Sequence, residues 1–82
     1  MKFVCIKSKK DEDSFRMFKT FGTKIYELED LEQVDNKIKE CIEQEYNPII
    51  ISNEVANFSG DIITKYQNSN LVHIIIASDR RT

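Results

Sequence analysis

Short strand-like runs alternate along this chain with stretches whose apolar residues recur at helical spacing, and this alternation restricts the fold more than any other feature. The strand-like runs are residues 3–6, 23–27, 49–51 and 71–76. One of them, 49–51, is apolar throughout, and 71–76 is apolar apart from His73, as parallel strands buried on both faces are. One helical stretch separates each run from the next, and such alternation favours right-handed parallel connections. We therefore predict an α/β fold in the order β-α-β-α-β-α-β, with a small four-stranded parallel sheet flanked by helices.

Local signals place the helices between these strands. Asp30 is suited to cap the second helix, with Gln33 completing a capping-box pattern. Ser52 and Asn53 are suited to cap the third helix, and Gly22 to end the first. The second helix is predicted to bury a stripe made of Leu31, Val34, Ile38, Cys41 and Ile42. The third is predicted to bury a face made of Val55, Phe58, Ile62 and Tyr66, with Gly60 as an internal weakness, and the whole is a receiver- or flavodoxin-like layered fold.

Length and charge narrow the class of protein further. A chain of 82 residues predicts one domain, residues 1–82. Twelve Lys and Arg against fourteen Asp and Glu give a net charge of −2, which disfavours nucleic-acid binding. The first apolar run is too short for a secretory signal, and no run approaches the length of a membrane span. We expect a soluble cytoplasmic protein without direct membrane insertion.

The strand ends carry no recognisable catalytic chemistry. The loop after the first strand has no glycine with which to cradle phosphate, and Ser52 and Asn53 stand where a receiver has its phosphorylated Asp. His73 is the only histidine, and its place in a strand favours a core-edge or interface role. Cys5 and Cys41 lie in apolar segments and are interpreted as packed, reduced thiols. We therefore predict no catalytic, cofactor-binding or metal-binding residues, and the acidic cluster 11–13 is interpreted as a helix cap.

Basic residues after the first and last strands leave one alternative open. Lys7, Lys9, Lys10, Arg80 and Arg81 could converge at one end of the sheet. They would form either a weak anion site, as in a small enzyme or anion-binding domain, or a solvated rim that faces an acidic partner.

Three segments carry a resemblance to a known family. Asp13-Ser14, Phe18-Lys19 and Gly22 lie in the order of an Asp-Thr pair, an aromatic followed by Arg, and a Gly. Residues 50–56 resemble an Ile-Thr-Glu-x-Leu-Ala motif after a third strand, and residues 74–80 an Ile-x-Ile-Pro-Asp-Arg ending. These motifs are similar to those of the F subunit of the V-type and archaeal-type (A-type) rotary ATPases. The chain departs from them in having Lys7-Ser8 for a Gly-Asp turn, Asn53 for a Glu and Ser78 for a Pro.

The resemblance implies a non-catalytic component, like the F subunit, of the central stalk of a V-type ATPase or ATP synthase. Such a component binds the coiled-coil D subunit within a larger rotary assembly and supports proton or sodium ion transport coupled to ATP. It would be cytoplasmic and peripheral to the membrane. The printed sequence ends at Thr82, where family members continue into a C-terminal helix, so we expect that helix to be lacking. Candidate partner-binding residues are Lys19, Arg80 and Arg81. The alternative is a stand-alone, receiver-like adaptor or regulatory domain that self-associates.

Overall fold

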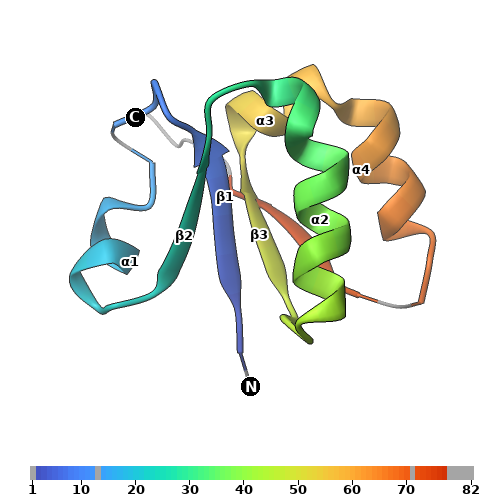
Figure 1. Ribbon diagram of the computed structural model, residues 1–82, viewed down its shortest axis with the longest axis horizontal. Helices are drawn as coiled ribbons and strands as arrows, with labels where there is room; N and C mark the ends of the chain where they lie inside the picture. The colour runs from blue at the N-terminus through green and yellow to red at the C-terminus, as the bar shows by residue number, and fades with distance from the viewer. Residues whose placement is uncertain (1, 13, 71, 78–82) are drawn as a thin grey trace.

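The computed structural model describes residues 2–12, 14–70 and 72–77, and it confirms the predicted α/β class (Figure 1). Four parallel strands form one sheet in the order β2-β1-β3-β4. The strands are β1 (Val4–Ser8), β2 (Lys24–Leu28), β3 (Ile49–Ser52) and β4 (Ile74–Ala77). The helices are α1 (Arg16–Thr20), the 3-10 turn η1 (Leu31–Gln33), α2 (Val34–Glu43), α3 (Asn53–Phe58) and α4 (Gly60–Gln67).

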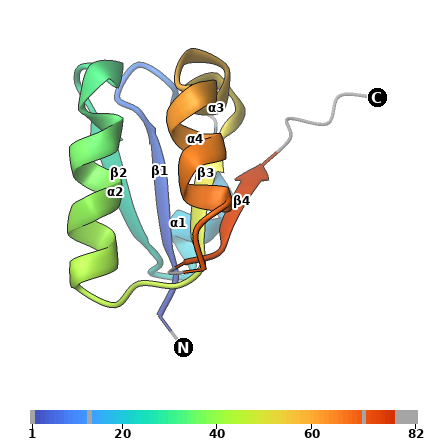
Figure 2. The same ribbon diagram turned by 90° about the vertical axis from the view of Figure 1, so that its right-hand side faces the viewer.

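The strand order places the helices on two faces of the sheet. The chain passes from β1 to β2 in one direction and then crosses back to β3 and β4, so right-handed connections put α1 opposite the later helices. Figure 2 shows this arrangement, with α2 and α4 on one side of the strands and α1 on the other. The side carrying α2, α3 and α4 is called the helix-covered face below.

The main core lies under the helix-covered face. Alternate residues of the central strands point into it, and Val4, Ile6, Ile49 and Ile51 are fully buried there. The predicted stripe of α2 is confirmed, because its central residues pack into the same cluster and its flanking residues are partly buried against it. The central residues are Val34, Ile38 and Cys41, and the partly buried flanking residues are Leu31 and Ile42.

Side-chain caps explain where two of the helical segments begin. Asp30 Oδ1 accepts a hydrogen bond from the Glu32 amide at 3.0 Å and starts η1, so the first turn is 3-10 before α2 continues. Ser52 Oγ accepts from the Val55 amide at 3.3 Å and caps α3. Gly22, with φ +79°, follows α1 as predicted, because a left-handed residue there costs little without a Cβ.

The predicted third helix is divided in the structure. It ends at Phe58 and restarts at Gly60, and the residue between adopts a conformation that lets α4 turn back along the sheet. The break changes which side chains are buried: Val55, Ala56, Ile63 and Tyr66 lie in the core, whereas Phe58 is 57% exposed. The prediction that Phe58 lies on the buried face is therefore wrong, since one continuous helical period was assumed across Gly60.

The last strand also differs from its prediction. Strand β4 pairs in parallel with β3, as expected, but it lies at the edge of the sheet. Ile74 is buried, while Ile75 is 49% and Ile76 is 40% exposed. A continuously apolar run here is not buried on both faces, because an edge strand has a neighbour on one side only.

Candidate partner-binding surfaces

One row of apolar side chains crosses the sheet on the face that carries α1. The strand register aligns Ile25, Cys5, Ile50 and Ile75, one from each strand in sheet order. Cys5 is fully buried and Ile50 partly buried, whereas Ile75 is about half exposed. Exposure therefore increases from Cys5 toward β4, while Ile25 at the other end of the row is partly buried. We call Ile50 and Ile75 the open face.

The short helix α1 explains why this row is covered on one side only. Its five residues lie beside β2 and β1 in Figure 1, away from β4. Phe15 is buried there, and Phe18 packs edge-on against Phe3 with ring centres 6.0 Å apart. These aromatic contacts lie on the α1 side of the row, and among the described residues Ile75 at its β4 end stays about half exposed.

The edge of β4 continues the open face. Its described residues are Ile-Ile-Ile-Ala, without charge or proline. Charged residues and prolines usually protect the edge strands of soluble proteins, because an unprotected edge pairs with other chains. The edge and the open face together form an apolar surface that fits a protein partner.

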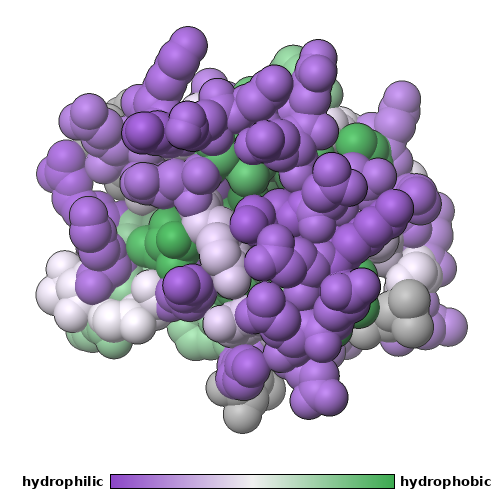
Figure 3. All heavy atoms as spheres, in the orientation of Figure 1, coloured by the Kyte–Doolittle hydropathy of each residue, from purple (hydrophilic) through white to green (hydrophobic). Residues whose placement is uncertain are grey.

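The outer surface of α2 has the opposite character. Figure 3 shows that this side of the molecule is largely hydrophilic, with hydrophobic atoms showing mainly over β2 beside α1 and at the top over the α3–α4 junction. Lysine and carboxylate side chains pair along α2, with Lys37 Nζ 3.1 Å from Glu40 Oε1 and Lys39 Nζ 3.9 Å from Asp35 Oδ2. Such a solvated face is a poor candidate for the centre of an interface.

The structure changes the position of Lys7. Strand β1 extends to Ser8, so Lys7 lies within the strand and is 6% exposed rather than part of a polar turn. Its Nζ donates to the Asp11 carbonyl at 2.6 Å and lies 3.6 Å from Glu27 Oε2. Lys7 therefore holds the loop after β1 and is not available to a converging anion site. Asp11 in turn accepts hydrogen bonds from the Ser14 amide and hydroxyl, at 3.0 and 2.6 Å, and caps the turn before α1.

Of the three predicted partner-binding residues, only Lys19 lies within the described part of the chain. Lys19 is exposed in the last turn of α1, which leads into the amino end of β2. Arg80 and Arg81 lie outside the described residues. Lys19 lies toward the amino end of the strands, because α1 runs antiparallel to them.

The two thiols are packed as predicted. Cys5 and Cys41 are fully buried, and burial raises the pKa of each thiol to about 11. Because the thiolate is the reactive form, both side chains are poor nucleophiles at neutral pH. Among the residues that the structure describes, no three His, Cys, Asp or Glu side chains are grouped so that they could hold a metal ion.

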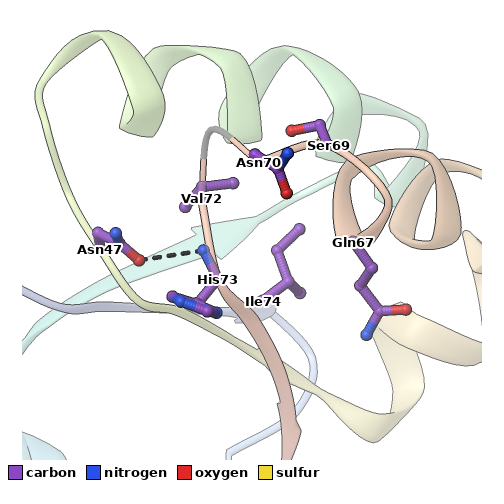
Figure 4. A pocket seen from close by; sticks show the side chains of 7 residues that line it. All are labelled: Asn47, Gln67, Ser69, Asn70, Val72, His73 and Ile74. Carbon is purple, nitrogen blue, oxygen red and sulfur yellow. Dashed lines mark hydrogen bonds between the residues drawn. The ribbon is translucent and has the colours of Figure 1, made fainter.

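His73 lies at the rim of a hollow of about 380 Å³ at the amino end of β4. Its backbone amide donates to Asn47 Oδ1 at 3.0 Å, and its carbonyl accepts from the Ile49 amide, so its main chain joins β3 to β4 (Figure 4). In the same view the His73 imidazole and the Gln67 carboxamide point to opposite sides. The polar groups do not converge on one point as they do in a small-molecule site. The His73 side chain is exposed, and the core-edge or interface role inferred for it stays a prediction.

The geometry thus defines the class of protein. It is a small α/β domain with a parallel sheet, and the open face and the edge of β4 expose apolar side chains. The family model of the ATP synthase (F/14-kDa) subunit matches residues 10–82. The chain belongs to this family, and the resemblance found in the sequence is confirmed. No match was found among curated proteins. Over the described residues, none of the helices is both long and apolar enough to cross a membrane.

The sequence did not predict the exposure of three apolar residues. Phe58 was assigned to the core, and Ile75 and Ile76 to a fully buried strand. The pair Ser59-Gly60 was the signal in the sequence for the helix break that exposes Phe58. No comparable signal marks β4 as an edge strand, because its composition is that of a central strand.

Proposed function

We propose that this protein is a non-catalytic component of the central stalk of a rotary ATPase or ATP synthase. In that role it would bind a coiled-coil partner like the D subunit and support proton or sodium ion transport coupled to ATP. It would be located in the cytoplasm, peripheral to the membrane as part of the complex. The observation that carries the proposal is membership, over residues 10–82, of the family of the ATP synthase (F/14-kDa) subunit.

The open face supports the proposal independently of the family. A stable protein interface needs an apolar centre surrounded by a polar rim. Ile50, Ile75 and the edge of β4 offer that centre, and a helix laid beside α1 would complete the half-covered row. Lys19, Arg80 and Arg81 are proposed as rim contacts, where charge sets the association rate and its dependence on salt.

Co-expression with the coiled-coil stalk protein of the same organism, followed by size-exclusion chromatography, tests this function. We expect a stable one-to-one complex, which Ile75→Asp disrupts because it places a charge at the apolar centre. Asn36→Asp, on the exposed outer side of α2, is the matched control and should leave the complex intact. Charge reversal at Lys19, Arg80 or Arg81 should weaken the complex more at low salt than at high salt.

Two separate peaks at micromolar concentration would contradict the stalk function. The self-associating adaptor would then be favoured if the protein alone eluted as a dimer and Ile75→Asp made it a monomer, because the uncharged edge of β4 also suits pairing with a second copy.

A further inference from the structure

Phe58 is an exposed aromatic residue at a place where the fold creates a hollow. It is the last residue of α3, and the chain turns at Ser59 before α4 begins. The hollow, about 520 Å³ in volume, is lined by this junction and by η1 from the other side. Its lining includes Phe58, Ile62, Glu32 and Asp61, and we call it the Phe58 hollow.

The carboxylates of this hollow have no cationic partner within the part of the chain that the structure describes. Glu32 and Asp61 are exposed, and neither forms an ion pair with a described residue. Glu27, Glu29, Asp35 and Glu40 each pair with a lysine. Other exposed carboxylates, those of Glu43, Glu45 and Glu54, also have no ion pair with a described residue, so the hollow is distinguished by two such carboxylates that line it together with an exposed ring. The Phe58 hollow therefore combines an exposed aromatic ring with two carboxylates that are not neutralised within the described chain.

The hollow is also open to close approach. Apart from its chain neighbours and its own helix backbone, a Cβ placed on Gly60 would meet no described atom within 4 Å, so a partner backbone could lie against this turn. Ser59 lines the hollow as well, and its buried hydroxyl has no hydrogen-bond partner among the described residues. Ile62 is partly buried and adds apolar surface beside the ring.

We propose that the Phe58 hollow is a docking site for a Lys or Arg side chain carried by a helix of a protein partner. The cation would lie over the Phe58 ring, where the negative face of the ring attracts it, with the carboxylates of Glu32 and Asp61 at its sides. The aliphatic stem of the same side chain would pack on Ile62. Charge complementarity selects this occupant, because an acidic segment would place like charges together at a cost in affinity.

The inference rests on the proposed function only for the identity of the partner as the coiled-coil stalk protein. The hollow lies at the α3–α4 junction and the open face lies on the α1 side of the sheet, so the two surfaces are tested by different substitutions. The stalk partner would then touch the protein at a second point that fixes its orientation.

The first test titrates the ¹⁵N-labelled protein with a synthetic amphipathic helical peptide of Leu and Arg, monitored by NMR. Amide shifts should concentrate at Glu32 and at residues 57–62. Phe58→Ala should weaken peptide binding about tenfold, as loss of an aromatic anchor does. Glu32→Gln and Asp61→Asn should each weaken it about threefold and reduce its dependence on salt.

Matched controls keep this test specific. Phe21→Ala removes an exposed aromatic residue at the α1–β2 turn, Glu43→Gln removes an exposed carboxylate at the end of α2, and neither should change peptide binding. A peptide with Glu in place of Arg should give no shifts in the hollow. Equal shifts with both peptides, or shifts that gather elsewhere, would overturn the inference. Asp61 lies in the first turn of α4, so circular dichroism of each variant should confirm that the fold is retained.

The second test measures the affinity of the coiled-coil stalk protein for the same variants by titration calorimetry. If the wild type binds and Phe58→Ala binds equally well, the inference that the Phe58 hollow is a docking site is wrong, while the proposed function stands. If the stalk protein does not bind but the basic peptide occupies the hollow, the proposed function fails and the docking site stands.

Discussion

At the scale of single residues, two serines in similar positions have different roles. Ser52 precedes α3 and caps it through its side chain, whereas Ser59 precedes α4 and makes no side-chain cap bond to a described residue. Both are buried, but the Ser59 hydroxyl has no hydrogen-bond partner among the described residues. A buried hydroxyl without a partner lowers stability, while a capping hydroxyl raises it.

Replacing each serine by alanine should therefore have unequal effects. Ser52→Ala should lower the free energy of unfolding by about 1 kcal/mol, because the Val55 amide loses its acceptor. Ser59→Ala should leave the free energy of unfolding unchanged or raise it slightly, since no hydrogen bond within the described chain is lost. Urea denaturation of both variants measures the difference. Equal losses would show that Ser59 has a stabilising partner after all.

The role of a single residue was predicted correctly from the sequence where its neighbours along the chain determine that role. A serine directly after an apolar strand predicts a cap, and Ser52 is one. Lys7 was assigned to a polar turn because it begins the polar run 7–10 that follows the first apolar run. It stays in β1 because the Asp11 carbonyl and Glu27 come from other segments and satisfy its charge. Partners that are distant in sequence cannot be recognised from local pattern.

At the scale of elements, a hydrogen bond joins α4 to α2 across the helix-covered face. Tyr66 Oη donates to Asp35 Oδ1 at 2.6 Å. This bond lowers the pKa of the Asp35 carboxyl, and burial together with the bond raises the pKa of Tyr66 to about 12. The ring of Tyr66 is buried in the main core, so its hydroxyl is held at one position.

Tyr66→Phe removes this bond and keeps the ring. We expect the free energy of unfolding to fall by about 1 kcal/mol at pH 7; this is less than a fully buried charged bond contributes, because the Asp35 side chain is 32% exposed. A double-mutant cycle with Asp35→Asn should show non-additive losses, since both changes remove one interaction. Additive losses in urea denaturation would contradict the coupling.

The same contact predicts a pH dependence. Because the pKa of Asp35 is lower in the folded state than its ordinary value of 3.8, its contribution is complete above that value and is lost as pH falls through the lowered pKa. The stability difference between wild type and Tyr66→Phe should therefore shrink as the pH falls below the ordinary value. Denaturation measured from neutral pH down into the acid range checks this, and a difference that stays constant would contradict it.

The buried face of a helix could be predicted from the sequence only where the helical spacing of apolar residues continues without a break. The stripe of α2 was predicted correctly, because ten residues keep one helical period. The third helix was not, because the break at Ser59 shifts the period and turns Phe58 outward. The exposure of Ile75 was not predictable either, since it depends on the strand order, which apolar runs do not encode.

At the scale of the whole molecule, one main core carries most of the stability. The helices α2, α3 and α4 meet the central strands in a single cluster, while α1 contributes a small aromatic group on the other face. A chain of 82 residues has a free energy of unfolding of only about 4–12 kcal/mol at the usual stability per residue. The molecule therefore has little reserve against a charge placed in that cluster.

Ile38→Asp should unfold the protein. Ile38 is fully buried at the middle of the α2 stripe, where a carboxylate would lose its hydration without gaining a partner. That cost is several kcal/mol, comparable with the whole free energy of unfolding, and the cavity left by isoleucine adds to it. Asn36→Asp on the exposed side of the same helix is the control, and it should keep the wild-type melting transition because its charge stays in water. Thermal melting followed by far-ultraviolet circular dichroism distinguishes the two. A cooperative transition of Ile38→Asp near that of the control would show that packing of α2 on the main core is not needed for folding. The stability would then have to come from the other face of the sheet, where Ile75 is about half exposed and buries little apolar surface.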